Sequence, residues 1–249
     1  MSVNAVLHSE WTKIRSVRST VWTLPLAALL LIGIGAGVCG SVSADDAGAR
    51  TFDPVQLGYY GIFFAHVMVI AFAVLVVGNE YSTATIRTSL AVVPRRGLFY
   101  GAKLATGAAL SLVAGVVASA GTFLVSQRLL AGHGAHLGDA GTVRAVVAGA
   151  LYFPVLAVMC MGITTMLRSL TLAMGLLVPF LFLVSPVLAE IPGLRDLAWY
   201  LPDRAGQYPL RLHLDAAAPY GPVTGFLVMV VWAVLAATGG WLVLRRRDA

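Results

Sequence analysis

The sequence is poor in charge. Only 11% of its 249 residues are Asp, Glu, Lys or Arg, whereas 59% are hydrophobic. A soluble domain carries about 25% charged residues, so this composition excludes an ordinary soluble protein. It is typical of an integral membrane protein in which membrane-crossing segments take up most of the length. We therefore expect one transmembrane domain over residues 1–249 and no separate soluble domain.

Several chemical signatures are also missing. There is no G-x-x-x-x-G-K-[ST] phosphate loop, so the chain cannot bind ATP by that route. No Ser/His or paired-carboxylate arrangement lies at catalytic depth, which leaves an intramembrane hydrolase without visible machinery. The only two cysteines, Cys39 and Cys160, fall inside or at the edge of apolar stretches. We interpret them as small packing residues rather than as a disulfide or a metal pair.

Long apolar runs are abundant. Six stretches are long enough to cross a bilayer core of about 30 Å, which takes about 20 helical residues. They are residues 21–40, 57–77, 104–125, 145–166, 170–189 and 222–244. The first apolar run has about 19 residues, whereas the apolar region of a signal peptide has about 7–15 residues. A retained span is therefore favoured over a cleaved leader. The sequence predicts an all-α membrane protein with six transmembrane helices.

The charges predict its orientation. With both termini inside, 11 of the 17 basic residues but only 3 of the 11 acidic residues lie on the inner side. The positive-inside rule then places both termini in the cytoplasm of a multi-pass protein of the cell inner or plasma membrane. The longest outer connection, residues 190–221, contains prolines that predict short helices or turns. Whether it re-enters the membrane stays open.

Asp, Glu, Lys and Arg are absent from all six spans as drawn. Ion-coupled transporters and proton pumps need intramembrane ionisable groups, so this absence counts against them. His66 lies near the middle of the second span, where a neutral histidine bonded to a neighbouring helix is the first interpretation and substrate contact the alternative. Pro179 and Pro186 predict kinks in the fifth span.

Two histidines and an aspartate share an outer loop that reads GHGAHLGD. His133, His136 and Asp139 have residue types that can bind a metal, but the glycines leave them unpositioned. We interpret the segment as a solvated loop and expect no metal site.

Residues 1–19 form an amphipathic segment. Its apolar side carries Val3, Val6, Leu7, Trp11, Ile14 and Val17. Such a helix would rest in the inner interface, with Trp11 at headgroup level. Glu10 falls within the apolar arc, where a lipid-facing charge is unfavourable. We infer that Glu10 meets a basic partner, in this chain or in another.

The loop of residues 78–103, GNEYSTATIRTSLAVVPRRGLFYGAK, contains a second amphipathic segment. At helical pitch, Ile86, Leu90 and Val93 form one apolar stripe. Ser82 or Thr83 is expected to cap the helix, and a proline at position 94 to end it. A docked partner would bury the stripe. The alternative is a loop whose basic residues only fix topology and bind lipid headgroups.

These segments resemble parts of the type-2 ABC exporter permeases. EYSTATIRTSLAVVPRR resembles the family's first cytoplasmic loop, in which Ala84 replaces the usual glycine and favours helix. SEWTKIRSVRS, residues 9–19, resembles the elbow helix with its Glu-x-x-Lys core. LPDRAGQ, residues 201–207, resembles the segment between the last two spans. The residues that match the loop pattern are Glu80, Tyr81, Thr85, Ile86, Arg87, Pro94, Arg95, Arg96 and Lys103.

The resemblance implies an assembly. Two permease chains would pair, as a homodimer or with a relative, and two copies of a separate ABC ATPase would dock on them. ATP and Mg would bind the ATPase, and this chain would hold no cofactor and bind no nucleic acid. The expected coupling residues are Glu80, Tyr81, Thr85, Ile86, Arg87, Leu90, Pro94, Arg95 and Arg96, and those of the elbow helix are Glu10, Trp11 and Lys13.

The resemblance also implies a function. The chain would be the non-enzymatic permease of an exporter of hydrophobic or amphipathic molecules such as drugs, natural products or lipids, as in multidrug efflux. The path would run along the second and fifth spans, near His66, Pro179 and Pro186. No outer domain could receive a binding protein, which favours export over import. An intramembrane lipid-acting enzyme and a non-transporting scaffold or sensor are the alternatives.

Overall fold

The computed structural model describes residues 3–43, 52–93, 95–130, 132–215 and 217–246. Within these ranges it contains helices and no strand. Six helical segments are long and apolar enough to cross a membrane: α2 (Arg18–Gly40), α4 to α5 (Pro54–Ser82), α7 (Arg96–Leu129), α8 (Thr142–Leu167), α9 to α10 (Leu170–Glu190) and α13 (Pro222–Arg246). The predicted all-α membrane fold is confirmed, and each segment contains one predicted span.

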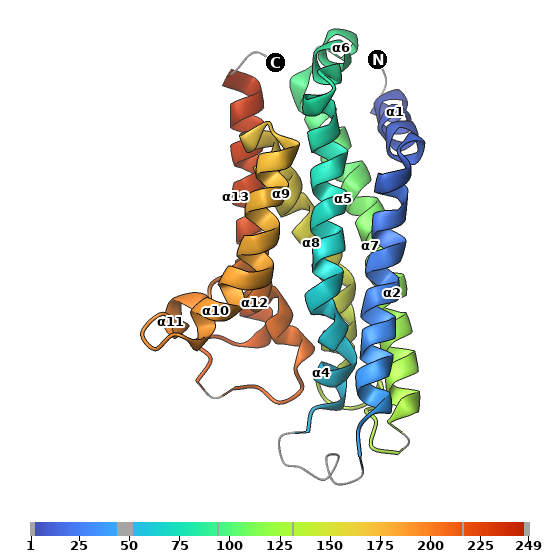
Figure 1. Cartoon of the computed structure of the whole chain (residues 1–249), viewed down its shortest axis with the longest axis vertical. Helices are drawn as coiled ribbons and strands as arrows, with labels where there is room; N and C mark the ends of the chain where they lie inside the picture. The colour runs from blue at the N-terminus through green and yellow to red at the C-terminus, as the bar shows by residue number, and fades with distance from the viewer. Residues whose placement is uncertain (1–2, 44–51, 94, 131, 216, 247–249) are drawn as a thin grey trace.

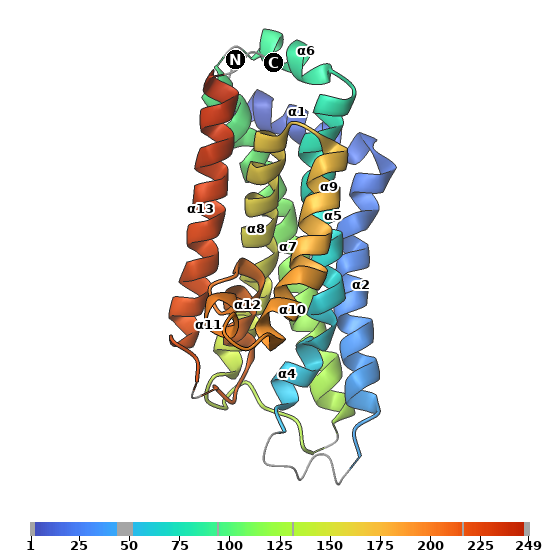
Figure 2. The same cartoon turned by 60° about the vertical axis from the view of Figure 1, so that its left-hand side comes forward.

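The bundle has two distinct ends. One end, here called the α6 end, carries α1 (Val3–Ser16), α6 (Thr85–Val92) and both ends of the described chain (Figure 1). The opposite end, the α12 end, carries α11 (Arg195–Ala198), α12 (Pro202–Gln207) and the 3-10 turn η3 (Tyr208–Leu210) (Figure 2). Helix α1 lies within the predicted amphipathic segment 1–19 but ends at Ser16, and Arg18 already begins α2. Short helices lie between residues 190 and 221, as the prolines there predicted.

The core is built around α5 and α8, which are the most buried of the six segments. Helix α8 packs against α5, α7 and α13. A Cβ on Gly162 would lie 2.4 Å from the carbonyl oxygen of Ala236, so only glycine permits this approach of α8 to α13. Small residues at such crossings are typical of membrane helix packing. Cys39 and Cys160 are both buried, which fits their interpretation as packing residues.

Small polar side chains join the spans inside this core. The hydroxyl of Tyr59 lies 2.6 Å from that of Ser119, and Ser119 donates to the carbonyl of Val146 at 2.7 Å. Thr122 donates to the carbonyl of Leu31 at 3.1 Å. Such bonds satisfy groups that could find no water in a bilayer.

The fifth span is irregular where its prolines lie. Helix α9 ends at Pro179, a π-helical turn, η2, spans Phe180–Val184, and α10 runs over Ser185–Glu190. Pro186 follows directly in the first turn of α10. Proline lacks a backbone donor, and a π-helical turn is a recognised way of absorbing such a break. The irregularity expected from the two prolines thus takes the form of a π-turn.

Candidate functional site: a charge cluster at the α6 end

Helix α1 presents one narrow face to the bundle. Val6, Glu10 and Ile14 are buried at four-residue spacing, which places them in one row. Trp11 and Val3, predicted on the same side, are exposed. Trp11 is therefore free to lie at headgroup level, with Arg15 Cζ 5.8 Å from its ring centroid.

Glu10 binds two lysines. Its Oε1 accepts from Lys13 Nζ at 2.7 Å, and its Oε2 accepts from Lys103 Nζ at 2.5 Å. Lys103 comes from the first turns of α7, so this bond joins α1 to a transmembrane helix. The inferred basic partner of Glu10 is present in the same chain.

Glu80 completes the cluster from the end of α5. Its Oε1 lies 2.7 Å from Lys13 Nζ and 3.0 Å from Lys103 Nζ. Lys13 also donates to Ser89 Oγ of α6 at 3.1 Å. Two carboxylates and two ammonium groups thus join α1, α5, α6 and α7. We call Glu10, Lys13, Glu80 and Lys103 the charge cluster.

The members of the charge cluster differ in exposure. The side chains of Glu10 and Lys103 are 1% and 4% exposed, whereas that of Lys13 is 42% exposed. Burial opposes ionisation of Glu10, but the ammonium groups of Lys103 and Lys13 outweigh it and hold its pKa below the usual value. Burial likewise opposes the charge of Lys13, but its bonds to Glu10 and Glu80 raise its pKa. Glu10 and Lys13 are therefore both charged near neutral pH.

An apolar cluster lies beside these charges. It contains Val6 of α1, Ile86 and Val93 of the α6 segment, Phe99, Tyr100 and Ala102 of α7, and Leu244 of α13, with Leu90 and Tyr81 packed against it. Ile86 and Val93 are thus buried by their own chain, and Leu90 is partly buried against the same cluster. This corrects the expectation that a partner protein buries Ile86 and Val93.

Other contacts attach α7 to α13 at the same end. Arg96 Nη1 donates to the carbonyl of Leu244 at 2.8 Å, and the hydroxyl of Tyr100 donates to that of Ala237 at 2.9 Å. Arg96, expected to face a partner, therefore supports the bundle. Pro94 lies outside the described residues.

The opposite face of α6 is open. Thr85, Arg87, Thr88, Ala91 and Val92 are exposed, as is the following Arg95. Val92 is 63% exposed, which is unusual for an apolar residue on a helix whose other face is anchored. Of the expected coupling residues, Thr85, Arg87 and Arg95 are accessible to a partner. Glu80 is not accessible to a partner, because its carboxylate pairs with Lys13 and Lys103.

The start of α6 differs from the expected capped helix. Neither Ser82 nor Thr83 caps it; the residue before it is Ala84, with φ 56° and ψ 12° in the left-handed region and no side-chain cap. Ala84 was expected from the sequence to favour helix. In the structure Ala84 instead occupies a left-handed conformation that glycine adopts without strain.

Replacing Ala84 with glycine is expected to stabilise the chain by about 1 kcal/mol, because the left-handed strain of alanine exceeds the entropic cost of glycine. Thermal unfolding of the purified protein in detergent measures this. The matched control is Ala91→Gly, at an exposed helical position, which should destabilise by about 1 kcal/mol. Shifts of the same sign in both variants would contradict the assigned backbone.

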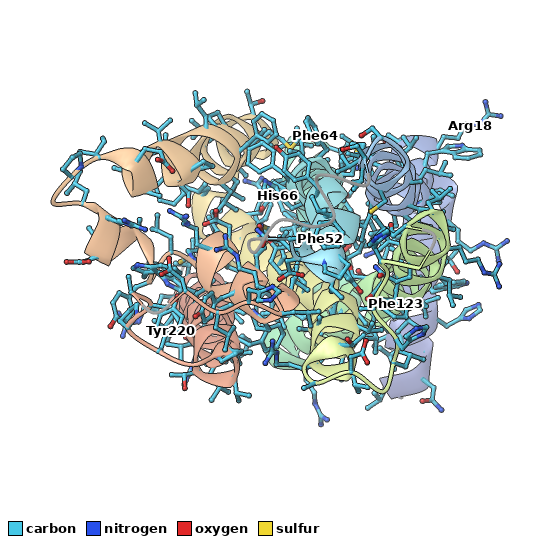
Figure 3. The ribbon with its side chains drawn as sticks, turned by 90° about the horizontal axis from the view of Figure 1, so that it is seen from below. Arg18, Phe52, Phe64, His66, Phe123 and Tyr220 are labelled. Carbon is cyan, nitrogen blue, oxygen red and sulfur yellow. The ribbon has the colours of Figure 1, made fainter. Side chains whose placement is uncertain are left out.

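Of the three predicted path residues, His66 is buried, Pro186 is partly buried and Pro179 is exposed. Figure 3 shows His66 in the interior and Phe64 toward the periphery of α5, and His66 is 1% exposed. Both of its ring nitrogens are buried without a hydrogen-bond partner in the described part of the chain. The expected bond to a neighbouring helix is therefore not made. Pro179 and Pro186 flank the π-turn next to it.

The segment LPDRAGQ contains α12. Its Asp203 is buried and accepts a bond from the hydroxyl of Ser185 in α10 at 2.7 Å. Burial raises the pKa of Asp203 although this bond lowers it. In the loop of His133 and His136, Asp139 accepts from the backbone N–H of His136 at 2.7 Å, which is a turn-forming bond.

Sequence reasoning missed two features of this site. The first is the role of Lys103, whose place at the start of a span signals that an acidic partner lies nearby. The second is the exposed Val92, which lies on the face of α6 opposite the stripe. Its signal was an apolar residue out of phase with that stripe.

The fold and the site define a multi-pass membrane protein with a short polar helix anchored at one end. A family model described as ABC-2 family transporter protein matches residues 6–185. The chain belongs to this family, which confirms the resemblance to type-2 ABC permeases. It is a membrane permease subunit of an ABC transporter, a class of complex that includes an ATPase. No curated protein matches the chain significantly.

Proposed function

We propose that the chain is the permease of an ATP-driven exporter of hydrophobic or amphipathic molecules. Two copies would pair in the cell membrane, with the α6 end in the cytoplasm and one ATPase subunit docked on each. ATP and Mg would act on the ATPase alone. Six spans without Asp, Glu, Lys or Arg at their centres support a path for apolar cargo rather than for ions.

The observation that carries this proposal is that α6 is anchored to the bundle on one face and exposed on the other. Ser89 and Ile86 attach one face to the charge cluster and the apolar cluster. The other face offers Arg87, Thr88 and Val92 to a partner. A force on the free face would reach α1, α5 and α7 through bonds of 2.5–3.1 Å. This arrangement suits a helix that passes motion of an ATPase into the spans.

Val92→Asp is expected to remove the ATPase, because a charge replaces the apolar centre of the docking face. The tagged chain is purified from its native membrane in mild detergent, and co-purifying proteins are quantified by mass spectrometry. The wild type should retain a stoichiometric protein that carries a phosphate loop. The amount of this protein that co-purifies with the variant should be at least about tenfold lower, which corresponds to about 1.4 kcal/mol of binding free energy.

The matched control is Val3→Asp, which also places a charge on an exposed valine at the α6 end but lies on α1. It should keep the ATPase. Equal loss in both variants would assign the effect to charge at this surface in general. A well-folded wild type that reproducibly purifies without any such protein would overturn the proposed function.

A further inference from the structure

His66 has unused hydrogen-bonding capacity in a buried place. A neutral imidazole has one N–H donor and one nitrogen acceptor, and buried polar atoms are almost always bonded. In the ranges that the structure describes, neither nitrogen of His66 has a partner. An unpartnered imidazole inside a membrane protein is unfavourable for folding alone and therefore points to a ligand.

Two phenyl rings cover this imidazole. Phe63, one turn earlier on α5, and Phe182 of the π-turn have ring centroids 4.5 Å apart at an interplanar angle of 32°. Their centroids lie 5.7 Å and 6.2 Å from that of His66, both edge-on. Each ring is only partly buried. Both rings therefore contact the buried imidazole and are also partly accessible at the surface of the described chain.

A cavity adjoins this cover at the α12 end. It has a volume of about 310 Å³, and its lining includes Phe63, Tyr60, Asp203 and Gln207. His66 does not line it. Phe63 thus faces the cavity and also contacts His66, whereas Phe182 contacts both Phe63 and His66 without lining the cavity.

The cover has a movable half. Phe182 lies in η2, between Pro179 and Pro186, where the regular α-helical ladder is interrupted. Such interruptions are where helices bend, and π-turns are frequent at functional sites. A bend here would move Phe182 while Phe63 stays on the buried helix α5.

We propose that Phe63, Phe182 and His66 form a binding subsite for a planar aromatic group that carries a hydroxyl, closed in this structure and opened by a bend at the π-turn. The parted rings would stack on the ligand's faces, and the imidazole would exchange hydrogen bonds with a hydroxyl, which both donates and accepts. This inference rests on the proposed function and names the substrate chemistry.

Histidine modification by diethyl pyrocarbonate, mapped by mass spectrometry on the full chain in detergent, tests the cover. In the wild type, exposed His213 should react and His66 should not. Phe182→Ala should make His66 react at least about tenfold faster, which corresponds to about 1.4 kcal/mol of lost protection. Phe182→Leu, which keeps bulk, should retain most of the protection.

The matched control is Leu183→Ala, on the same π-turn but exposed. It should leave His66 protected. Unfolding is monitored through Cys160, which is buried and must stay unreactive toward maleimide in every variant. If His66 reacts in the wild type as fast as His213, or stays protected in folded Phe182→Ala, the subsite is overturned.

The ligand chemistry is tested with 2-naphthol and naphthalene as probes. In Phe182→Ala, 2-naphthol should protect His66 from modification, whereas naphthalene, which lacks the hydroxyl, should protect it less. Equal protection by both would overturn the role of His66 as a hydrogen-bonding contact.

A last arm separates this inference from the proposed function. In the complex with its ATPase, ATP should make wild-type His66 reactive. If the Phe182→Ala and 2-naphthol results hold but ATP has no effect, the ATP-driven function fails and the subsite stands. If ATP acts but Phe182→Ala does not, the subsite fails alone.

Discussion

Replacing Lys103 with methionine is expected to destabilise the folded chain by about 3–5 kcal/mol, the usual cost of leaving a buried charge without its partner. The ammonium of Lys103 lies 2.5 Å from Glu10 and 3.0 Å from Glu80, and its side chain is 4% exposed, so little water could replace it. Unfolding of the purified protein in detergent, followed by thermal or denaturant titration, measures the effect.

Lys13→Met is the matched control, because Lys13 binds the same two carboxylates from a partly exposed position. Lys13→Met should destabilise the folded chain less than Lys103→Met does, because water can reach the carboxylates from the partly exposed side that Lys13 leaves. The double variant Glu10→Leu/Lys103→Met should recover much of the loss, because it removes the two most buried charges of the cluster together. Equal effects of the two single lysine changes would refute the role assigned to burial.

The same cluster sets a pH window. The pKa of Glu10 is lowered, so its contribution is complete above the ordinary value of 4.5 and is lost as pH falls through the lowered one. The pKa of Lys13 is raised, so its contribution is complete below 10.5 and is lost as pH rises through the raised value. Lowering the pH should therefore reduce the difference in the free energy of unfolding between the wild type and the double variant.

Ile86→Asp is expected to damage the fold itself, by about 3 kcal/mol or more, because it removes a buried isoleucine and places a carboxylate in an apolar cluster. Unfolding midpoint and yield of inserted protein measure this. Val92→Asp, six residues on and on the open face, should leave both almost unchanged while removing the ATPase.

The two positions thus separate stability from docking. If Ile86→Asp kept wild-type stability and lost only the ATPase, the isoleucine would face the partner, and the packing of α6 against α1 and α7 would be refuted. Ile86→Val serves as a conservative check and should cost only about 0.5–1.5 kcal/mol.

Length and hydropathy were sufficient for the spans. A bilayer requires about 20 apolar residues whatever the neighbours are, so each span is encoded locally. The need for a partner of Glu10 was also readable, since a charge in an apolar arc must be neutralised. The sequence did not show that Lys103 is this partner, because 93 positions separate it from Glu10 and only helix packing brings the two residues together.

The stripe on α6 shows the limit of periodicity. The spacing of Ile86, Leu90 and Val93 indicates that something covers them, but carries no information on whether the cover is another protein or the same chain. Here the cover includes Val6 and Leu244, from opposite ends of the sequence. The left-handed backbone at Ala84 was hidden for a similar reason, since the junction between α5 and α6 imposes it and the residue type does not.

The contact of Leu244 with the apolar cluster also sets the order in which the helices can pack during synthesis. Because α13 follows the other five described spans in the chain, Phe99 and Ile86 lack part of their cover until α13 has been synthesised. Helix α6 acquires its full support only when α13 has packed beside α7. The open face of α6 therefore belongs to a helix whose packing is completed only after the sixth described span is in place.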